Sequence, residues 1–363
     1  MLISLREYGY CFREHNLHAV LAGCAVRNRD QFAFLTETVL TEKQFQKEKE
    51  KGWDPTIRPK GFLLFWRTAE TKWYGNDHMN WKERVVGTST KPRNHSVVVE
   101  RFPVYPSLDS RSFVTGGGTP AHEETPLRAY SQGGFLRGDV SRLKMIDGWL
   151  YACGGGRSLG KRLDEGNWQS LTYTGDLDVK EKEKYRGFDD FDGFGEQDIY
   201  AAGSRGDVWH FDGKAWKRVP FPSDMEISSV CCGGDEKVYI SGEKGVTFCG
   251  LGDRWQEIDN EEVADGRAFR DMVWYEGKVW ATNDDGLWVI ENGAIKKADV
   301  PDDVEKCVGH LSAGDGVLLL AGAGGAAFKE NGEWNTIILI QEMDRQFVEA
   351  GMEPEPLDRD DWY

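Results

Sequence analysis

The sequence predicts an all-β fold, a single closed β-propeller of four-stranded antiparallel blades. The second half of the chain repeats one short apolar stretch four times, and a further glycine follows each copy at the same offset. Successive copies of this glycine are 39, 41 and 39 residues apart. A period of about 40 residues is typical of propeller blades. The four copies are residues 199–203, 238–242, 279–283 and 318–322, and the glycines are Gly206, Gly245, Gly286 and Gly325.

The repeat at residues 269–298 shows how one copy makes a blade. Apolar and polar residues alternate along four short segments, which is the pattern of strands with one buried face. Glu276 and Gly277 form the first turn, and further turns containing glycine and asparagine separate the other segments. We therefore expect four antiparallel strands, at residues 269–275, 278–282, 287–290 and 294–298.

Earlier copies of the repeated stretch extend the count to seven blades. Residues 149–154 form another second strand, whose glycine precedes Gly203 by 49 residues. Residues 85–87 and 19–23 are fainter copies, with glycines spaced by 67 and 64 residues, so insertions must enlarge the early blades. Six or eight blades are the alternatives, because residues 62–66 could belong to an insertion or to a separate blade. We expect the ring of blades to be closed by an N-terminal strand that pairs with the last blade.

These patterns divide the chain into a propeller and a C-terminal extension. The propeller is predicted over residues 1–340, with irregular blades before residue 140 and regular repeats after it. Residues 341–350 can form a short helix that Gly351 ends. The remaining residues, 353–363, carry five acidic side chains against one basic side chain and end in two aromatic residues. This tail is either a contact segment or a frayed terminus.

A turn followed by tryptophan recurs before the fourth strand of four repeats, at Trp168, Trp216, Trp255 and Trp334. Together with residues 199–213, these turns resemble the degenerate repeats of bacterial propellers grouped with the WD40, kelch and sialidase Asp-box families. The resemblance covers roughly residues 140–340. It implies the propeller fold. It implies no function, because such repeats occur in enzymes, assembly factors and binding scaffolds alike.

Three insertions are where we expect specificity, since loops on a rigid scaffold usually carry recognition. Residues 41–52 begin with a capping box and end at a glycine, which predicts a short surface helix; a solvated spacer is the alternative. Residues 103–139 contain several glycines and little periodicity, which predicts a long loop, ordered or disordered. Residues 176–184 are a run of charges that we interpret as a solvated connection.

Composition limits the partners and the compartment. The net charge of −16, from 61 acidic and 45 basic residues, disfavours nucleic acid and anionic membranes and favours a basic partner. Seven cysteines, mostly in apolar stretches, predict free thiols. The neighbours Cys231 and Cys232 should point to opposite faces of a strand. The N-terminus lacks the pattern of a secretory signal and no apolar run could span a bilayer, so a cytoplasmic location is predicted.

No catalytic, cofactor or metal motif emerges. Residues 155–161 nearly match a phosphate-binding loop, but Arg162 replaces the Ser or Thr that would coordinate magnesium. A hairpin turn follows in place of the helix whose amides would hold phosphate. The seven histidines form no metal-spaced set, and the 61 acidic residues single out no carboxylate pair. We therefore predict no catalytic residue, no cofactor and no metal.

The function predicted from these observations is non-enzymatic protein binding. Its most concrete form is an immunity-type inhibitor, monomeric when free, that blocks a basic intracellular toxin by contact. One alternative is a hydrolase or lyase acting on a glycan in the central channel, which inward-facing charged groups with shifted pKa values would mark. Another is a scaffold for a larger complex. The predicted partner-binding residues are Asp189, Asp190, Asp192, Asp284, Asp285, Asp358, Asp360, Asp361, Trp362 and Tyr363.

Overall fold

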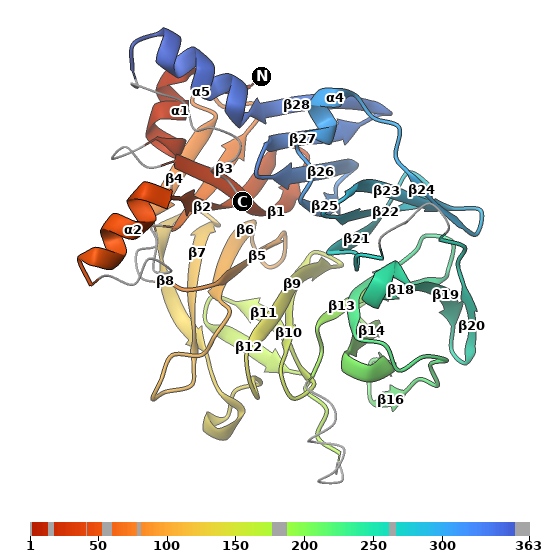
Figure 1. Cartoon of the computed structure of the whole chain (residues 1–363). Helices are drawn as coiled ribbons and strands as arrows, with labels where there is room; N and C mark the ends of the chain where they lie inside the picture. The colour runs from red at the N-terminus through yellow and green to blue at the C-terminus, as the bar shows by residue number, and fades with distance from the viewer. Residues whose placement is uncertain are drawn as a thin grey trace. The chain divides into compact units, whose positions relative to one another are not determined.

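The computed structural model describes residues 2–13, 18–40, 42–52, 60–77, 81–175, 187–260 and 266–352. In this part of the chain the strands form seven sheets, each of four antiparallel strands that follow one another in the sequence (Figure 1). The fold is a seven-bladed β-propeller with a short C-terminal helix, which confirms the predicted fold class and blade count. Residues 1–82 and 300–363 form one compact unit, unit 1, and residues 83–299 form a second, unit 2.

The described residues of unit 1 form two blades and four helices. The helices are α1 (Leu5–Phe12), α2 (Glu42–Glu50), α4 (Asp302–Glu305) and α5 (Ile340–Glu349). The strands are β1 (His18–Asn28), β2 (Gln31–Val39), β3 (Lys60–Trp66), β4 (Trp73–Asp77), β25 (His310–Gly314), β26 (Val317–Gly322), β27 (Gly325–Glu330) and β28 (Glu333–Leu339). Helices α2 and α5 confirm the predictions for residues 41–52 and 341–350.

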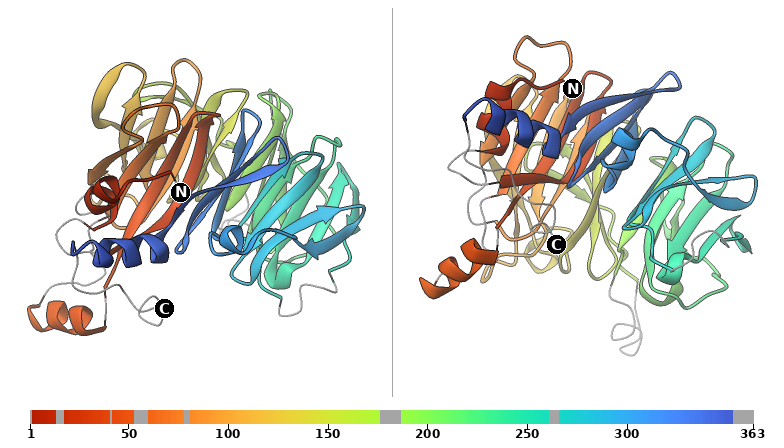
Figure 2. Two further views of the ribbon diagram at one scale, coloured as in Figure 1. Left: turned by 90° about the horizontal axis from the view of Figure 1, so that it is seen from above. Right: turned by 45° about the horizontal axis from the view of Figure 1, so that its top comes forward.

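Helices α1 and α5 pack side by side through a buried polar contact (Figures 1 and 2). The Tyr8 hydroxyl of α1 donates a hydrogen bond of 2.5 Å to Asp344 Oδ1 of α5. Arg13 Nη1 lies 3.1 Å from the same oxygen, and both charged side chains are buried. The Phe347 ring packs edge-on against Tyr8. The C-terminal helix is therefore held by the N-terminal helix and covers the core that the two blades of unit 1 share.

Unit 2 contains five blades. Their strands are β5 (Arg84–Ser89), β6 (His95–Glu100), β7 (Ser110–Gly116), β8 (Thr119–Leu127), β9 (Val140–Ile146), β10 (Trp149–Gly154), β11 (Ser158–Asp164), β12 (Asn167–Ser170), β13 (Asp190–Gly195), β14 (Asp198–Gly203), β15 (Asp207–Phe211), β16 (Trp216–Arg218), β17 (Ile227–Cys232), β18 (Val238–Gly242), β19 (Thr247–Leu251), β20 (Arg254–Glu257), β21 (Asp271–Tyr275), β22 (Lys278–Asn283), β23 (Gly286–Glu291) and β24 (Ala294–Lys297). Short 3-10 turns are η2 (Tyr130–Gln132), η3 (Ser204–Gly206) and η4 (Glu243–Gly245). The apolar core lies between the faces of neighbouring blades.

The glycine that ends the repeated stretch marks a point where two backbone segments almost touch. At Gly203 an added Cβ would lie 2.0 Å from the carbonyl oxygen of Gly187. Similar clashes with a carbonyl oxygen would occur at 1.8 Å for Gly154, 2.2 Å for Gly242 and 2.0 Å for Gly322. The φ of Gly203 is −161°, so glycine is required for space and not for a left-handed backbone. The repeat in the sequence therefore records a repeated close approach in the structure.

Two of the fainter sequence copies are first strands and not second strands. Residues 19–23 lie in β1 and residues 85–87 lie in β5, each of which opens its blade. The Gly87 Cβ position would meet the side chains of Leu150 and Leu143 at 2.6 and 2.7 Å, so this glycine makes room for the neighbouring blade. First strands, like second strands, pack closely against neighbouring blades, which explains why the two kinds of strand have similar patterns of small and apolar residues. Residues 62–66 lie in β3 and add no eighth blade.

The prediction of a long loop at residues 103–139 is wrong, because β7 and β8 lie within it. Strand β8 reads Thr-Pro-Ala-His-Glu-Glu-Thr-Pro-Leu and is mostly exposed at the edge of its sheet. An exposed edge strand needs no alternation of apolar and polar residues, so no hydrophobic period revealed it. Residues 176–184 lie outside the described part of the chain.

The expected closure by an N-terminal strand is also wrong for the described residues. The last sheet consists of β25 to β28, all from the C-terminal part of the chain, and β28 supplies its fourth strand. The N-terminal segment contributes a hydrogen bond of 2.7 Å from Leu2 N to Ile337 O. Within the ranges described above, no helix has the length and apolar content needed to cross a membrane.

Replacing Gly203 with alanine should lower the free energy of unfolding by about 2 kcal/mol or more, because a carbonyl oxygen occupies the Cβ position. Gly23→Ala is the matched control. The nearest atom to its Cβ position is a Leu35 side-chain carbon at 3.3 Å, so the cost should stay below about 1 kcal/mol. Urea unfolding of both variants measures the difference. Equal costs would contradict the close-approach explanation.

Candidate protein-binding surface

The blades of unit 2 present two ends, which we name the proximal and distal ends. The proximal end is where the first strands β5, β9, β13, β17 and β21 begin, and the distal end is where they finish. Backbone hydrogen bonds join successive blades at the proximal end, such as Val140 N to Arg101 O at 2.8 Å and Phe188 N to Gly154 O at 3.1 Å. The loops between second and third strands lie at the same end, since neighbouring strands are antiparallel.

Asp190, a predicted partner contact, is instead the centre of a buried charge network. It is 1% exposed, and its carboxylate lies 2.8 Å from Lys144 Nζ on the neighbouring first strand β9. Asp190 Oδ2 also accepts a hydrogen bond of 2.8 Å from Val230 N on β17. Burial would lower the pKa of Lys144, but the charges of Asp190 and Asp192 outweigh burial and raise that pKa. Asp190 therefore joins three blades and does not reach the surface.

Arg142 extends the network to a fourth blade. Its Nη1 lies 2.9 Å from Asp271 Oδ1 on β21, and its Nη2 donates to the carbonyl oxygen of Arg270. Its Nε lies 3.8 Å from Asp190. Burial would lower the pKa of Arg142, but Asp271 and Asp190 raise it overall, so the guanidinium stays charged. The first strands β9, β13, β17 and β21 are thus connected by side chains that neutralise one another.

Asp192, on the same strand as Asp190, is also used within the protein. Its Oδ2 accepts a hydrogen bond of 2.8 Å from Cys232 N, and its Oδ1 accepts one of 2.9 Å from Gly193 N. Burial raises the pKa of Asp192, and Lys144 and these amides counter only part of that effect. Asp192 as a whole residue is half-buried.

Asp189 belongs to a row of carboxylates at the proximal end. Asp139, Asp189 and Glu226 each stand immediately before the first strand of successive blades. Burial, followed by the charges of Glu226 and Asp139, raises the pKa of Asp189 to about 6, while Arg101 opposes this shift. Arg101 Nε lies 3.9 Å from Asp139. We call Asp139, Asp189 and Glu226 the carboxylate row.

Asp284 and Asp285 lie in the exposed turn between β22 and β23, also at the proximal end. Asp284 contacts Arg270 at 2.5 Å and Arg267 at 3.2 Å, and Asp285 lies 3.6 Å from Arg267. Both aspartates are therefore accessible and are already paired with arginines. Asp358, Asp360, Asp361, Trp362 and Tyr363 lie outside the described residues.

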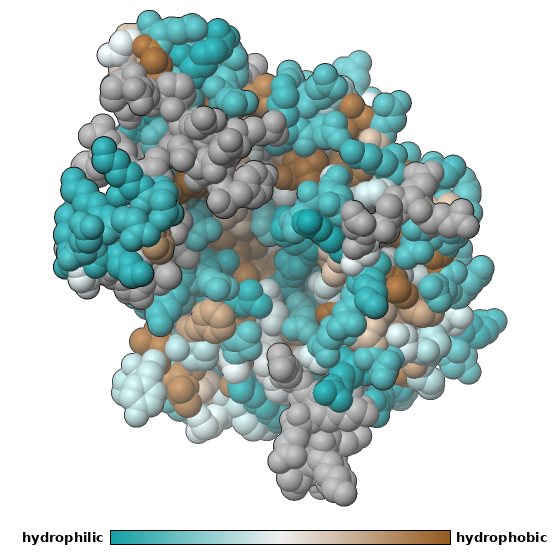
Figure 3. All heavy atoms as spheres, viewed as in Figure 1, coloured by the Kyte–Doolittle hydropathy of each residue, from teal (hydrophilic) through white to brown (hydrophobic). Residues whose placement is uncertain are grey.

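The structure adds an exposed apolar patch that the sequence did not single out. Tyr105 is 86% exposed, and four neighbouring side chains from the β6–β7 loop and the segment after β8 are also exposed. Figure 3 shows brown and pale spheres gathered at the lower left, where these loops lie. The Arg137 guanidinium lies 4.2 Å from the centre of the Tyr130 ring. We call Phe102, Val104, Tyr105, Leu108 and Tyr130 the aromatic patch.

Hydrogen bonds hold the aromatic patch in place. Gln132 Nε2 donates to Ser107 O at 2.6 Å, and Ala129 N donates to Asp109 Oδ1 at 2.9 Å. The hydrogen bond between Val140 N and Arg101 O ties the start of the loop to β9. The patch and the carboxylate row therefore lie at the same end of unit 2. Tyrosine, tryptophan and arginine are enriched where proteins bind proteins.

The rejected phosphate loop and the cysteines follow the sequence predictions. Residues 155–157 join β10 to β11, residues 158–161 lie in β11, and the predicted hairpin turn joins β11 to β12. Arg162 is buried, with Nη2 at 2.6 Å from Glu124 Oε2. All seven cysteines are free. Burial raises the pKa of Cys231 and of Cys232 well above the ordinary value, so both remain thiols. Among the described residues no group of three or more His, Cys, Asp or Glu could hold a metal ion.

One curated relative is similar to this chain in sequence. The Immune protein Tsi7 of Pseudomonas aeruginosa is 32% identical over 206 residues. The match covers 57% of this chain and 66% of Tsi7, so the chain spans slightly less than two thirds of that relative. No protein-family model matches the chain.

Solved structures share the fold at low identity. The WD40 β-propeller domain of Doa1 has a TM-score of 0.55 at 10% identity, with 86% of this chain and 93% of that one covered. YCF48 bound to D1 peptide has a TM-score of 0.54 at 14% identity, with 88% and 97% covered. An acylaminoacyl peptidase of Pyrococcus horikoshii has 0.51 at 8% identity, with 92% and 54% covered. The chain is thus a β-propeller, and such neighbours include peptide binders and enzymes.

Asp190→Asn and Asp284→Asn should differ sharply in stability, although both were predicted as partner contacts. Asp190→Asn leaves Lys144 and Arg142 short of a buried counter-charge, and the free energy of unfolding should fall by about 3 kcal/mol. Asp284→Asn removes an exposed pair and should cost less than about 1 kcal/mol. Chemical denaturation measures both. Similar small costs would show that the network is not required for folding.

Asp189→Asn should stabilise the free protein above pH 6. An ordinary aspartate has a pKa of 3.8, and the folded protein raises that of Asp189 to about 6. Ionisation therefore costs the folded state stability, a cost that disappears as pH falls from about 6 towards 4. At pH 7.5 we expect the free energy of unfolding of the asparagine variant to exceed that of the wild type by about 1 kcal/mol, since Asp189 is only partly buried. The difference should be smaller at pH 4.5. A difference independent of pH would contradict this assignment.

Proposed function

We propose that the protein is an immunity-type inhibitor that binds a protein toxin and blocks it by contact. The observation that carries this proposal is the sequence similarity to an immune protein, which extends over more than half of the chain. A rigid propeller with loops of varied length is suited to such binding, because the blades fix the loops that touch the partner. The toxin is the partner class that an immune protein implies.

The binding surface in this proposal is the proximal end of unit 2. The aromatic patch there supplies large, exposed side chains such as Tyr105, and arginines such as Arg137 stand beside it. Buried aromatic and arginine anchors contribute most of the free energy at protein interfaces. The carboxylate row adds negative charge at the same end, and the whole chain carries −16. A basic toxin surface would be attracted to this end and would then dock against the patch.

Catalysis in the propeller centre is the second candidate, since the pKa values of Arg142 and Lys144 on strand β9 are raised. Arg142, Lys144, Asp190 and Asp271 are, however, paired with one another at short distances. A catalytic group must reach a substrate, and these groups serve to connect blades. The non-enzymatic function is therefore preferred. Seven free cysteines favour the cytoplasm, where thiols stay reduced, and we propose that the free inhibitor is a monomer there.

Capture of the tagged protein from its own cells at low and high salt tests this function. We expect one basic protein, released at high salt, that stops growth when produced alone and is harmless when co-produced with this chain. Recovery of no partner, or persistent toxicity in the presence of the chain, would refute the proposal.

The captured partner then allows the surface to be tested. The double variant Phe102→Ala, Tyr105→Ala should weaken binding by about 30-fold or more. Leu251→Ala is the matched control, because Leu251 is exposed but lies at the distal end, and its effect should stay within about twofold. Binding constants come from surface plasmon resonance. If the double variant folds normally and binds with unchanged affinity, the interface does not include the aromatic patch.

A further inference from the structure

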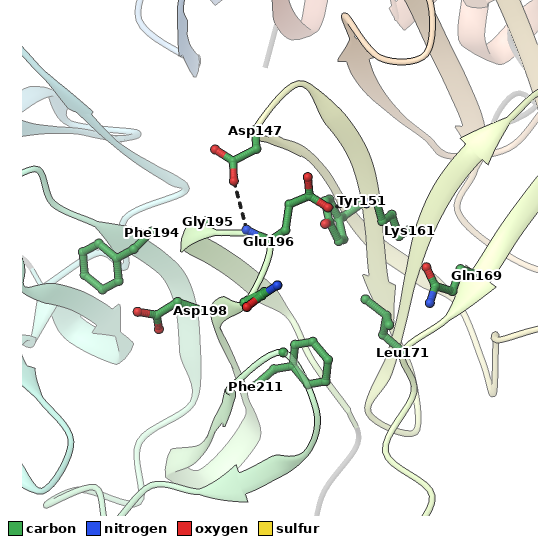
Figure 4. A pocket seen from close by; sticks show the side chains of 12 residues that line it. Asp147, Tyr151, Lys161, Gln169, Leu171, Phe194, Gly195, Glu196, Asp198 and Phe211 are labelled. Carbon is green, nitrogen blue, oxygen red and sulfur yellow. Dashed lines mark hydrogen bonds and ion pairs between the residues drawn. The ribbon is translucent and has the colours of Figure 1, made fainter.

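A pocket at the distal end of unit 2 has features that the proposed function does not use (Figure 4). It is a cavity of about 640 Å³ between the blade β9–β12 and the blade β13–β16. Gln169 and Leu171 line the side of the first blade, and Phe194 and Asp198 line the side of the second. Tyr151 lies deep between them. The volume exceeds that of a single amino-acid side chain and is within the range of small-ligand sites.

The Tyr151 hydroxyl lacks a hydrogen-bond partner among the described residues, which suggests that a polar group of a ligand could supply one. Tyr151 is 0% exposed and lines the pocket, yet its hydroxyl makes no hydrogen bond to any described residue. A buried hydroxyl without a partner is costly, so such groups in proteins are usually satisfied. Burial and the charges of Glu196 and Asp147 raise the pKa of Tyr151, so the phenol stays neutral and its oxygen can accept a hydrogen bond.

The charge of the pocket favours a cation. The carboxylates of Asp147 and Glu196 line it together with one ammonium, of Lys161. Asp198 also lines the pocket, but its Oδ1 lies 2.7 Å from His210 Nε2. Lys161 is neutralised by its ion pair with Glu196, and its Nζ lies 4.3 Å from the centre of the Trp149 ring. Asp147 is held towards the pocket because its Oδ2 accepts a hydrogen bond of 3.0 Å from Glu196 N. The site therefore already stabilises one cation of the protein itself by carboxylate and aromatic contacts.

The remaining walls suit a hydrocarbon chain. Phe211 is buried at the base, Leu171 is half-buried and Phe194 is partly exposed at the mouth. Apolar walls with a few convergent polar groups are typical of small-ligand sites. A ligand with a charged head and an apolar stem would place the head near Tyr151 and Asp147 and the stem along these rings.

We propose that this pocket binds a guanidinium or ammonium group carried on an aliphatic stem, donating hydrogen bonds to the Tyr151 oxygen and the Asp147 carboxylate. The group could belong to a free small molecule or to an arginine or lysine side chain of a peptide. The site lies at the opposite end of the blades from the proposed toxin surface, and its existence does not depend on that function.

Calorimetry with two matched pairs of probes tests this proposal on the whole chain. Butylguanidinium and its neutral analogue butylurea represent the free ligand. A blocked Gly-Arg-Gly peptide and its citrulline counterpart represent the side chain. We expect the cationic member of at least one pair to bind at low salt, at least about tenfold more tightly than its neutral analogue. Binding by butylguanidinium assigns a small molecule, and binding by the peptide alone assigns a side chain.

Three variants locate the binding. Tyr151→Phe should weaken it about fivefold without loss of stability, because the hydroxyl has no partner to lose within the described residues. Lys161→Gln should tighten it about twofold or more, since a competing cation leaves and Glu196 is freed. Asp253→Asn, an exposed aspartate in the β19–β20 turn outside the pocket, is the control and should change nothing.

The proposal is overturned if neither cation binds at millimolar concentration, if the neutral analogues bind equally well, or if Lys161→Gln weakens binding. The last result would indicate an anionic ligand held by Lys161. Tyr151→Phe binding as tightly as the wild type would likewise place the ligand elsewhere.

Discussion

The buried carboxylate of Asp190 is the constraint on which unit 2 depends. A charge at this depth is tolerated only with its counter-charges in contact, and Lys144 at 2.8 Å supplies the first. Arg142 then carries the network to Asp271, so the first strands of four blades must keep one spacing. The glycines that end β10, β14 and β18 impose a similar limit, since Gly203 and its counterparts Gly154 and Gly242 leave no room for a side chain. Together these contacts fix the backbone from which the loops extend.

A fixed backbone of this kind allows the two ends of the blades to differ. At the proximal end, the aromatic patch and the carboxylate row combine apolar area with negative charge. At the distal end, two neighbouring blades border an open pocket that Tyr151 lines. The residues that connect the blades serve neither end directly. The proposed contacts with a protein and with a cation therefore lie at opposite ends of one scaffold. The aromatic patch lies on loops, whereas Tyr151 of the pocket lies on strand β10 and is buried between blades.

The partner contacts predicted from acidity differ in accessibility. Asp189, Asp284 and Asp285 lie at the proximal end and remain predicted contacts, whereas the same reasoning selected Asp190, which is buried. Sequence composition cannot separate a surface aspartate from one that meets a lysine on another blade. The aromatic patch was missed because Phe102 and Tyr105 lie in a segment without periodicity, where aromatic residues look no different from core residues. Only the structure shows that these side chains are exposed. They lie in a loop whose start is joined to β9 by the backbone hydrogen bond from Val140 N to Arg101 O.

The sequence by itself determined the fold class and the four-stranded repeat, because spacing and alternation are local properties that recur along the chain. It favoured seven blades and left six or eight open, and the structure has seven. The sequence also predicted the hairpin turn at residues 165–168, which joins β11 to β12 where a phosphate-binding loop would lead into a helix. Only the tertiary structure decided which charges are buried, how the last blade is completed and where the pocket lies. Those features depend on contacts between side chains from different blades. The separation of Lys144 and Asp190 in the sequence does not indicate that the two side chains are in contact.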